Sequence, residues 1–215
     1  MTSKQWAQIA ARIALAGLVF PVWGQKWEVA PVGTYWRVSP TGLGSLNESA
    51  ATRQDDDTIL KGGVGYGVRL TRNTRGYYGH ELGMVRARAT LRSRIVVDDV
   101  KRTFEDKVFI DSFFYNFLIY FMPRDEAWRP YMTGGLQAIR YGEPHFEQWD
   151  RGTSRNWGVN YGAGIKLMPV KHFIVRLDVR DYIGGGPYDL RFKSETKFGT
   201  RLRNQEFTVG IAIGF

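Results

Sequence analysis

The sequence predicts an all-β protein that forms an eight-stranded antiparallel up-and-down transmembrane barrel. Three observations lead to this fold class. Large apolar residues alternate with small or polar ones over most of the chain, at the two-residue period of a β-strand. The connections between the alternating segments are long and short in turn. One face of these segments collects charges of both signs, whereas the other face is aliphatic and aromatic.

Composition excludes several classes of protein before any motif is considered. The 215 residues contain no cysteine, which rules out disulfide scaffolds, thiolate zinc sites and thiol catalysis. Apolar residues make up 43% of the chain and its 25 glycines follow no three-residue period, so the composition is that of a folded protein. The net charge of +9 suits an anionic membrane surface or a nucleic acid and by itself selects neither.

Residues 1–25 are predicted to be a signal peptide. Lys4 and Arg12 precede the apolar run 13–22, which is too short to cross a bilayer as a helix. The alternative is an amphipathic helix that packs on the domain. We therefore expect export of the chain and one barrel domain over residues 26–215.

The first four strands are expected over residues 26–38, 59–70, 77–90 and 106–121. The first is the least regular of them. The second has the apolar row Leu60, Val64, Tyr66, Val68 and Leu70 opposite the row Lys61, Gly63, Gly65, Gly67 and Arg69. The alternation in the third is weaker and sets Leu82 and Met84 opposite Glu81. The fourth is apolar on both faces, with the heavier row Phe109, Phe113, Tyr115, Phe117, Ile119 and Phe121.

The last four strands are expected over residues 130–141, 157–168, 173–183 and 207–215. The final one alternates most clearly, and its apolar row is Phe207, Val209, Ile211, Ile213 and Phe215. Long connections are predicted at 39–57, 95–105, 142–156 and 184–203, and short turns at 72–76, 123–129 and 169–172. Because the number of strands is even, both ends of the barrel domain are expected on the short-turn side.

The charged face is predicted to line the barrel interior. An eight-stranded lumen is narrow, so small residues and paired charges suit it, whereas rows of bulky apolar residues suit lipid. The predicted interior charge network is Lys61, Arg69, Glu81, Lys166, Arg176, Asp178, Arg180 and Glu206. Mutual neutralisation in a packed interior is the favoured interpretation, and an ion or proton path is the alternative.

Aromatic residues near the strand ends are predicted to form two girdles at the membrane interfaces. The candidates are Trp27, Tyr35, Trp36, Tyr120, Trp128, Tyr131, Tyr141, Trp157 and Tyr182. Their repeated placement, more than any one of them, favours a membrane protein.

The chain resembles the small eight-stranded outer-membrane barrels of Gram-negative bacteria, typified by the membrane domain of outer membrane protein A and by outer membrane protein X. Several motifs carry the resemblance, namely Gly63-x-Gly65-x-Gly67, Tyr78-x-x-Glu81-x-Gly83, the run 160–164, the run 176–182 and the strand Phe207 to Phe215. The resemblance implies an outer-membrane location, contact with outer-membrane lipid and lipopolysaccharide, and a monomer. It also implies that Phe207, Val209, Ile211, Ile213 and Phe215 are the signal read by the barrel assembly machinery.

Catalysis is not expected, although some barrels of this kind modify lipid A and their deacylases use His, Ser and Glu. His80 and Glu81 are adjacent and therefore point to opposite faces of a strand, and Leu82 stands two residues after the histidine. No catalytic residue, cofactor or metal site is predicted. The acidic run Asp55 to Asp57 is interpreted as solvated, and the run 184–186 precedes no helix that would make it a phosphate loop.

Basic residues gather at and beyond the long-connection ends, where they suit either the phosphates of lipopolysaccharide or a solvated surface. They are Arg86, Arg88, Arg92, Arg94, Arg191, Lys193, Lys197, Arg201 and Arg203. Nucleic acid is a disfavoured partner because the chain is exported. The sequence thus predicts a non-catalytic outer-membrane barrel with a structural or surface-interaction role. The alternatives are a narrow ion channel or small-solute porin and a lipid A-modifying enzyme.

Overall fold

The computed structural model describes residues 26–39, 43, 58–74, 76–97, 100–124, 126–145, 149, 152–170, 172–188, 190 and 202–215. The predicted signal peptide, residues 1–25, lies outside the described residues, as does the acidic run Asp55 to Asp57. Within the described residues, no helix is long and apolar enough to cross a membrane.

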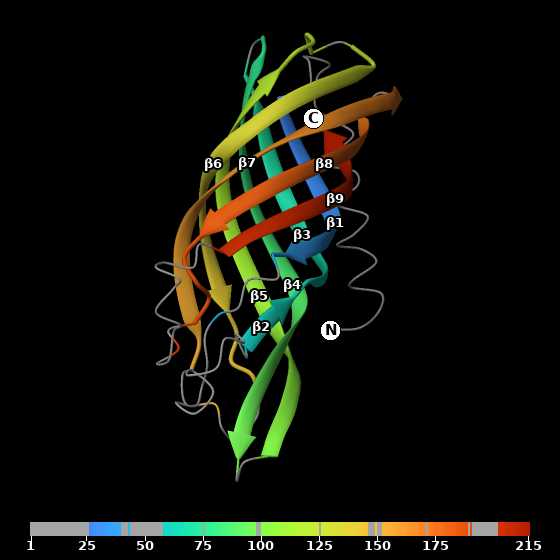
Figure 1. The fold of residues 1–215 in the computed structure, drawn as a ribbon. Helices are drawn as coiled ribbons and strands as arrows, with labels where there is room; N and C mark the ends of the chain where they lie inside the picture. The colour runs from blue at the N-terminus through green and yellow to red at the C-terminus, as the bar shows by residue number, and fades with distance from the viewer. Residues whose placement is uncertain are drawn as a thin grey trace, which may run out of the picture.

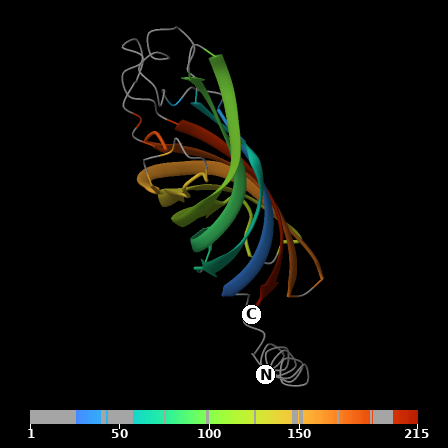
Figure 2. The same ribbon diagram turned by 90° about the horizontal axis from the view of Figure 1, so that it is seen from below.

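The described residues form one closed antiparallel sheet (Figures 1 and 2). Its strands are β1 (Trp27–Val38), β2 (Thr58–Lys61), β3 (Gly63–Asn73), β4 (Tyr78–Val97), β5 (Val100–Tyr120), β6 (Trp128–Tyr141), β7 (Ser154–Val170), β8 (Phe173–Gly184) and β9 (Leu202–Gly214). β1 pairs with β3, and both β2 and β3 pair with β4. From β4 on, each strand pairs with the next along the chain, and β9 pairs with β1 to close the sheet. Because β2 and β3 follow one another along β4, they act as one strand, and the predicted eight-stranded barrel is confirmed.

The closure between β1 and β9 continues to the end of the chain. The backbone N–H of Trp27 donates to the carbonyl of Phe215 at 2.9 Å, and the N–H of Phe215 donates back at 2.8 Å. Figure 2 shows the start of β1 beside the chain terminus at one end of the barrel. The backbone groups of both strands are therefore paired within the protein, as a lipid environment requires.

A bulge separates β2 from β3. Between the pairs Lys61↔Thr90 and Gly65↔Ala87, the first strand has three residues and β4 has two. The extra residue lies among glycines because the backbones approach closely there. A Cβ atom on Gly62 would lie 2.0 Å from the carbonyl oxygen of Trp36. A one-residue shift exchanges the two faces of a strand, so the alternation predicted across 59–70 changes phase at this point.

The prediction of a long connection at 95–105 is wrong. Pairing between β4 and β5 continues to Val97↔Val100, so most of those residues are strand. The alternation there is weak because β5 loses its second neighbour: β6 reaches only as far as Ile110, and residues 100–109 pair with β4 alone. The hairpin therefore extends past the other strands, as the green ribbons at the lower end of Figure 1 show.

The barrel has an apolar outer surface and a polar interior. On β9, Val209, Ile211 and Ile213 are 50–60% exposed, whereas Glu206 and Ala212 are fully buried. The outward row from Phe113 on β5 to Phe121, directly after the strand, spans eight steps of about 3.4 Å. A strand tilt of about 40° makes this belt about 20 Å tall. An exposed apolar belt of this extent is suited to lipid and not to water.

We expect Val209→Arg to destabilise the barrel by about 2–4 kcal/mol, because it places a charge on the lipid-facing surface. Thr208→Ser, on the neighbouring inward position, keeps a hydroxyl in the interior and is expected to cost little. Urea unfolding of the protein folded into lipid vesicles measures both. Equal losses at the two positions would contradict the inward and outward assignment of β9.

Candidate functional site: the barrel interior and its mouth

Six charged side chains fill the middle of the barrel and leave no net charge. This interior ion cluster comprises Arg69, Glu81, Arg176, Asp178, Arg180 and Glu206, all of them buried. Asp178 accepts hydrogen bonds from Arg69 at 2.7 Å and from Arg180 at 3.0 Å. Arg176 contacts the same carboxylate at 3.3 Å. One carboxylate on β8 thus faces the guanidinium groups of three arginines.

The other two carboxylates complete the pairing. Glu81 on β4 accepts from Arg176 at 2.7 Å and from Arg180 at 2.6 Å. Glu206 on β9 accepts from Arg69 at 2.9 Å. The contacts join strands β3, β4, β8 and β9 across the lumen, so the cluster connects opposite walls of the barrel. Buried charges are tolerated only when they are paired and hydrogen-bonded, and this arrangement meets that condition.

Hydroxyl groups and one aromatic ring surround the interior ion cluster. The Tyr131 hydroxyl donates to Asp178 at 3.1 Å and lies 2.9 Å from Arg176. The Tyr182 hydroxyl donates to Glu206, and Thr208 lies 2.9 Å from both Arg69 and Glu206. The guanidinium groups of Arg69 and Arg180 lie 5.4 and 5.0 Å from the centre of the Phe114 ring. These side chains supply further hydrogen bonds that buried charges need, although Arg69 Nε has no partner among the described residues.

Two members of the predicted network lie outside this cluster. Lys166 is buried but contacts Glu28 and the hydroxyl of Tyr120, closer to the short-turn end. Lys61 is not interior: its side chain is 44% exposed and bonds to Glu105 at 2.8 Å. The bulge at Gly62 is the physical reason, because it turns the Lys61 face of β2 outward.

Five of the aromatic residues predicted for the girdles point inward instead. They are Trp36, Tyr120, Tyr131, Tyr141 and Tyr182. Tyr35, Trp128 and Trp157 are exposed on the outer surface, as predicted, and Trp27 is half-buried. The alternation in the sequence could have given this result, because Tyr182 stands two residues after the inward Arg180 and therefore shares its face. On β1, Glu28 is an even number of residues before the inward Trp36 and lies inside for the same reason.

An apolar plug of four buried side chains lies at the end opposite the chain terminus, where the long connections lie. Leu43, Trp149, Tyr188 and Leu190 come from three of these connections, and all four are buried. The ring of Trp149 meets the ring of Tyr188 edge-on at 4.7 Å. The hydroxyl of Tyr188 donates to the carbonyl of Gly142 at 2.6 Å. Burial raises the pKa of this phenol, so it keeps its proton and remains a donor.

Two acidic side chains beyond the lipid-facing belt hold neighbouring segments in place. The hydrogen bond from Lys61 lowers the pKa of Glu105. Burial alone would raise the pKa of Asp106, but hydrogen bonds from the backbone N–H groups of His145 and Lys107, at 2.5 and 2.7 Å, outweigh burial and lower it. Both carboxylates are therefore ionised at neutral pH, and they attach β2 and the connection after β6 to the extended hairpin.

The three histidines are not brought together. His80 lies on the outer face of β4 and contacts the Tyr115 hydroxyl at 2.7 Å. His145 contacts Asp106 at 3.2 Å, and His172, in the turn between β7 and β8, contacts the carbonyl of Gly214 at 2.7 Å. Among the described residues, no group of three His, Cys, Asp or Glu side chains could hold a metal ion.

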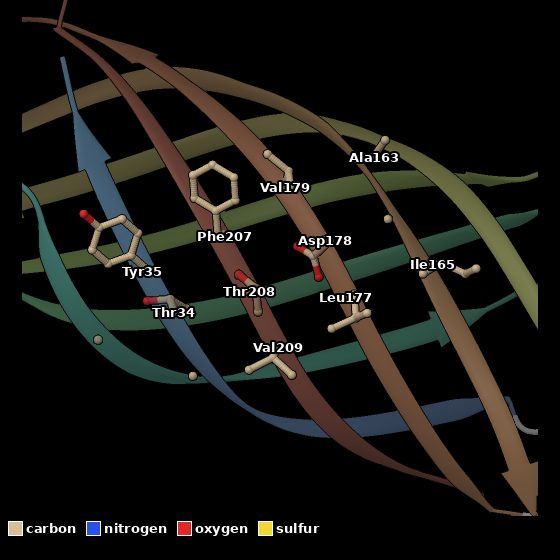
Figure 3. Close-up of a pocket in the computed structure, with 13 residues that line it drawn as sticks. Thr34, Tyr35, Ala163, Ile165, Leu177, Asp178, Val179, Phe207, Thr208 and Val209 are labelled. Carbon is tan, nitrogen blue, oxygen red and sulfur yellow. The ribbon is translucent and has the colours of Figure 1, made fainter.

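The outer surface carries an open groove over β1, β7, β8 and β9 (Figure 3). Its volume is about 830 Å³, and its walls are apolar side chains such as Tyr35, Leu177 and Phe207. At its long-connection end, Asp181 is bonded to Arg203 and to the hydroxyl of Tyr161, so the charges there are paired.

No protein family model matches the sequence, and no curated protein matches it either. Solved structures do. The attachment invasion locus protein Ail of Yersinia pestis, solved with the heparin analogue sucrose octasulfate, superposes with a TM-score of 0.53 at 11% identity, covering 88% of this chain and 97% of Ail. The outer membrane protein AlkL, solved in lipid bilayers, gives a TM-score of 0.52 at 12% identity, covering 91% of this chain and 93% of AlkL. The fold is that of a small outer-membrane β-barrel. The predicted resemblance is confirmed at the level of the fold.

We expect Asp178→Asn to destabilise the barrel by about 3–5 kcal/mol, because three guanidinium groups then face two carboxylates in its buried interior. The double variant Asp178→Asn with Arg69→Gln restores neutrality and should recover part of the loss. Urea unfolding in vesicles of Asp178→Asn, Arg69→Gln and the double variant measures the coupling free energy between the two residues. Strictly additive losses would contradict a shared cluster.

Proposed function

We propose that this outer-membrane barrel acts in surface interaction and not in catalysis or conduction. The observation that carries the proposal is that a filled, neutral barrel supports a two-stranded hairpin that extends past its mouth. The barrel then serves as a rigid support, and the extended part of β4 and β5 supplies the contact surface. In this proposal the long connections face the cell exterior and the short turns face the periplasm.

Basic side chains on the extended hairpin support binding of a polyanion. Arg94 and Arg102 are exposed on the hairpin where β5 has no second neighbour, and Lys107 is exposed closer to the barrel. Arg94 pairs in register with Thr103, and Arg102 pairs with Ile95, so the two arginines occupy opposite faces of the ribbon. Guanidinium groups bind sulfate and phosphate well. A sulfated or phosphorylated polysaccharide is the partner that this hairpin fits best, because a long flexible polyanion can contact both faces of the ribbon.

The comparison with Ail supports the same class of partner, since that barrel was solved with a sulfated heparin analogue. The filled lumen supports a non-conducting barrel, because the interior ion cluster occupies its middle and the apolar plug lies at its mouth. We further propose that the protein is a monomer in lipid and that the alternating row Phe207 to Phe215, outward on β9, serves as the assembly signal.

The test is binding to immobilised heparin by the protein folded in detergent micelles. We expect Arg94→Gln with Arg102→Gln to bind markedly more weakly and with a smaller dependence on salt. The control is Lys26→Gln with Arg72→Gln, which removes two exposed charges at the short-turn end and should leave binding unchanged. Equal binding by all three proteins would contradict the proposal.

A planar bilayer recording tests the closed lumen. We expect no stepwise conductance from the reconstituted protein, because the ion cluster fills the middle of the lumen and the plug lies at its mouth. Stepwise conductance would instead support the narrow channel. Mass spectrometry of lipid A from cells with and without the protein should show the same species, and a mass change would support the lipid-modifying enzyme.

A further inference from the structure

A row of charged residues crosses four neighbouring strands on the outer surface. The strand register pairs Arg86 with Asp111, Asp111 with Arg140, and Arg140 with Arg155. All four side chains point outward. On β4, β6 and β7 the arginine lies directly beyond the last apolar residue of the outward row. This basic row consists of Arg86, Asp111, Arg140 and Arg155. The sequence alone identified only Arg86 in it, because the strand register brings the others together.

The basic row has one carboxylate for three guanidinium groups. Asp111 is engaged by Arg86, which donates from Nε at 2.6 Å and from Nη2 at 3.1 Å. Arg140 and Arg155 are both exposed and stand directly opposite one another. Within the described residues, neither of them forms an ion pair. Like charges at opposed positions of a sheet repel one another, so this pair favours an anion that bridges the two groups.

An apolar groove lies directly beneath the basic row. It has a volume of about 590 Å³, is open to the outside, and spans strands β3 to β7. The next outward row down the strands lines it and includes Met84, Phe113, Ala138 and Trp157. Ala138 is the small residue of that row and makes room between its larger neighbours. Trp157 is 80% exposed, as tryptophans at a membrane interface are.

We propose that this face binds a phosphate-bearing acylated glycolipid of the outer leaflet. Arg140 and Arg155 hold a phosphate of the headgroup, and an acyl chain lies in the groove that Ala138 opens. A phosphate oxygen accepts charge-assisted hydrogen bonds from both guanidinium groups and removes their repulsion. The inference rests on the proposed orientation, with the long connections facing the cell exterior, but it is independent of the polyanion partner of the hairpin.

The groove on the opposite side shows why this face is selected. That groove, shown in Figure 3, is larger, but Arg203 at its end is already bonded to Asp181. It offers an apolar surface without two unpaired guanidinium groups. A phosphate group would gain less binding free energy there. Arg37 and Arg203 therefore provide a matched control at the same end of the barrel.

The test measures binding of diphosphoryl lipid A to the full chain in detergent micelles, by native mass spectrometry. We expect Arg140→Gln with Arg155→Gln to bind about tenfold more weakly or worse, because two charge-assisted contacts are lost. Arg37→Gln with Arg203→Gln should bind like the unmodified protein. Lipid A without its phosphates should bind the unmodified protein as weakly as diphosphoryl lipid A binds the double variant.

Ala138→Phe tests the acyl groove without changing any charge, and it too should weaken binding. Unfolding in urea and heparin binding are measured on every variant, so that loss of fold or failure of the hairpin proposal is recognised separately. Undiminished lipid A binding by the Arg140 and Arg155 double variant would overturn the inference. Release of the lipid by millimolar inorganic phosphate would also overturn it, since the site would then recognise free phosphate alone.

Discussion

The eight strands of this barrel enclose a lumen too narrow for bulk water, so the charges that line it have to compensate one another. Three guanidinium groups and three carboxylates do so around Asp178, across four strands. Tyr131, Tyr182 and Thr208 add hydrogen bonds to these ions from the same interior. Small inward residues such as Gly210 and Ala212 make room for these large side chains.

Because the lumen is filled with side chains, we place the proposed function on the surfaces of the barrel. Buried side chains from three connections lie at the mouth, and beyond it only the β4–β5 hairpin extends as strand among the described residues. The outer surface has two sides that differ in charge. On one side Arg203 and Asp181 neutralise each other above an apolar groove, and on the other Arg140 and Arg155 leave positive charge above a second groove. In our proposal these two sides therefore differ in the lipids they attract.

The sequence by itself determined the class of fold and the direction of most side chains. Both follow from the two-residue period, which is a property of each strand alone, so Arg176, Asp178 and Arg180 were placed inside without knowledge of their neighbours. The outward row of the last strand was predicted for the same reason. The same period could have placed the inward tyrosines inside. It did not, because an aromatic residue near a strand end suits the membrane interface equally well.

Only the tertiary structure decided which strands oppose one another and in what register. The bulge at Gly62 is a mismatch between two strands, and it exposed Lys61 although the alternation of its own segment placed that residue inside. The extension of β4 and β5 depends on pairing between them, which weak alternation did not reveal. Arg140 and Arg155 are 15 positions apart in the sequence, and no local pattern shows that they meet. Pairings of this kind depend on the whole barrel, because each strand takes its register from two neighbours at once.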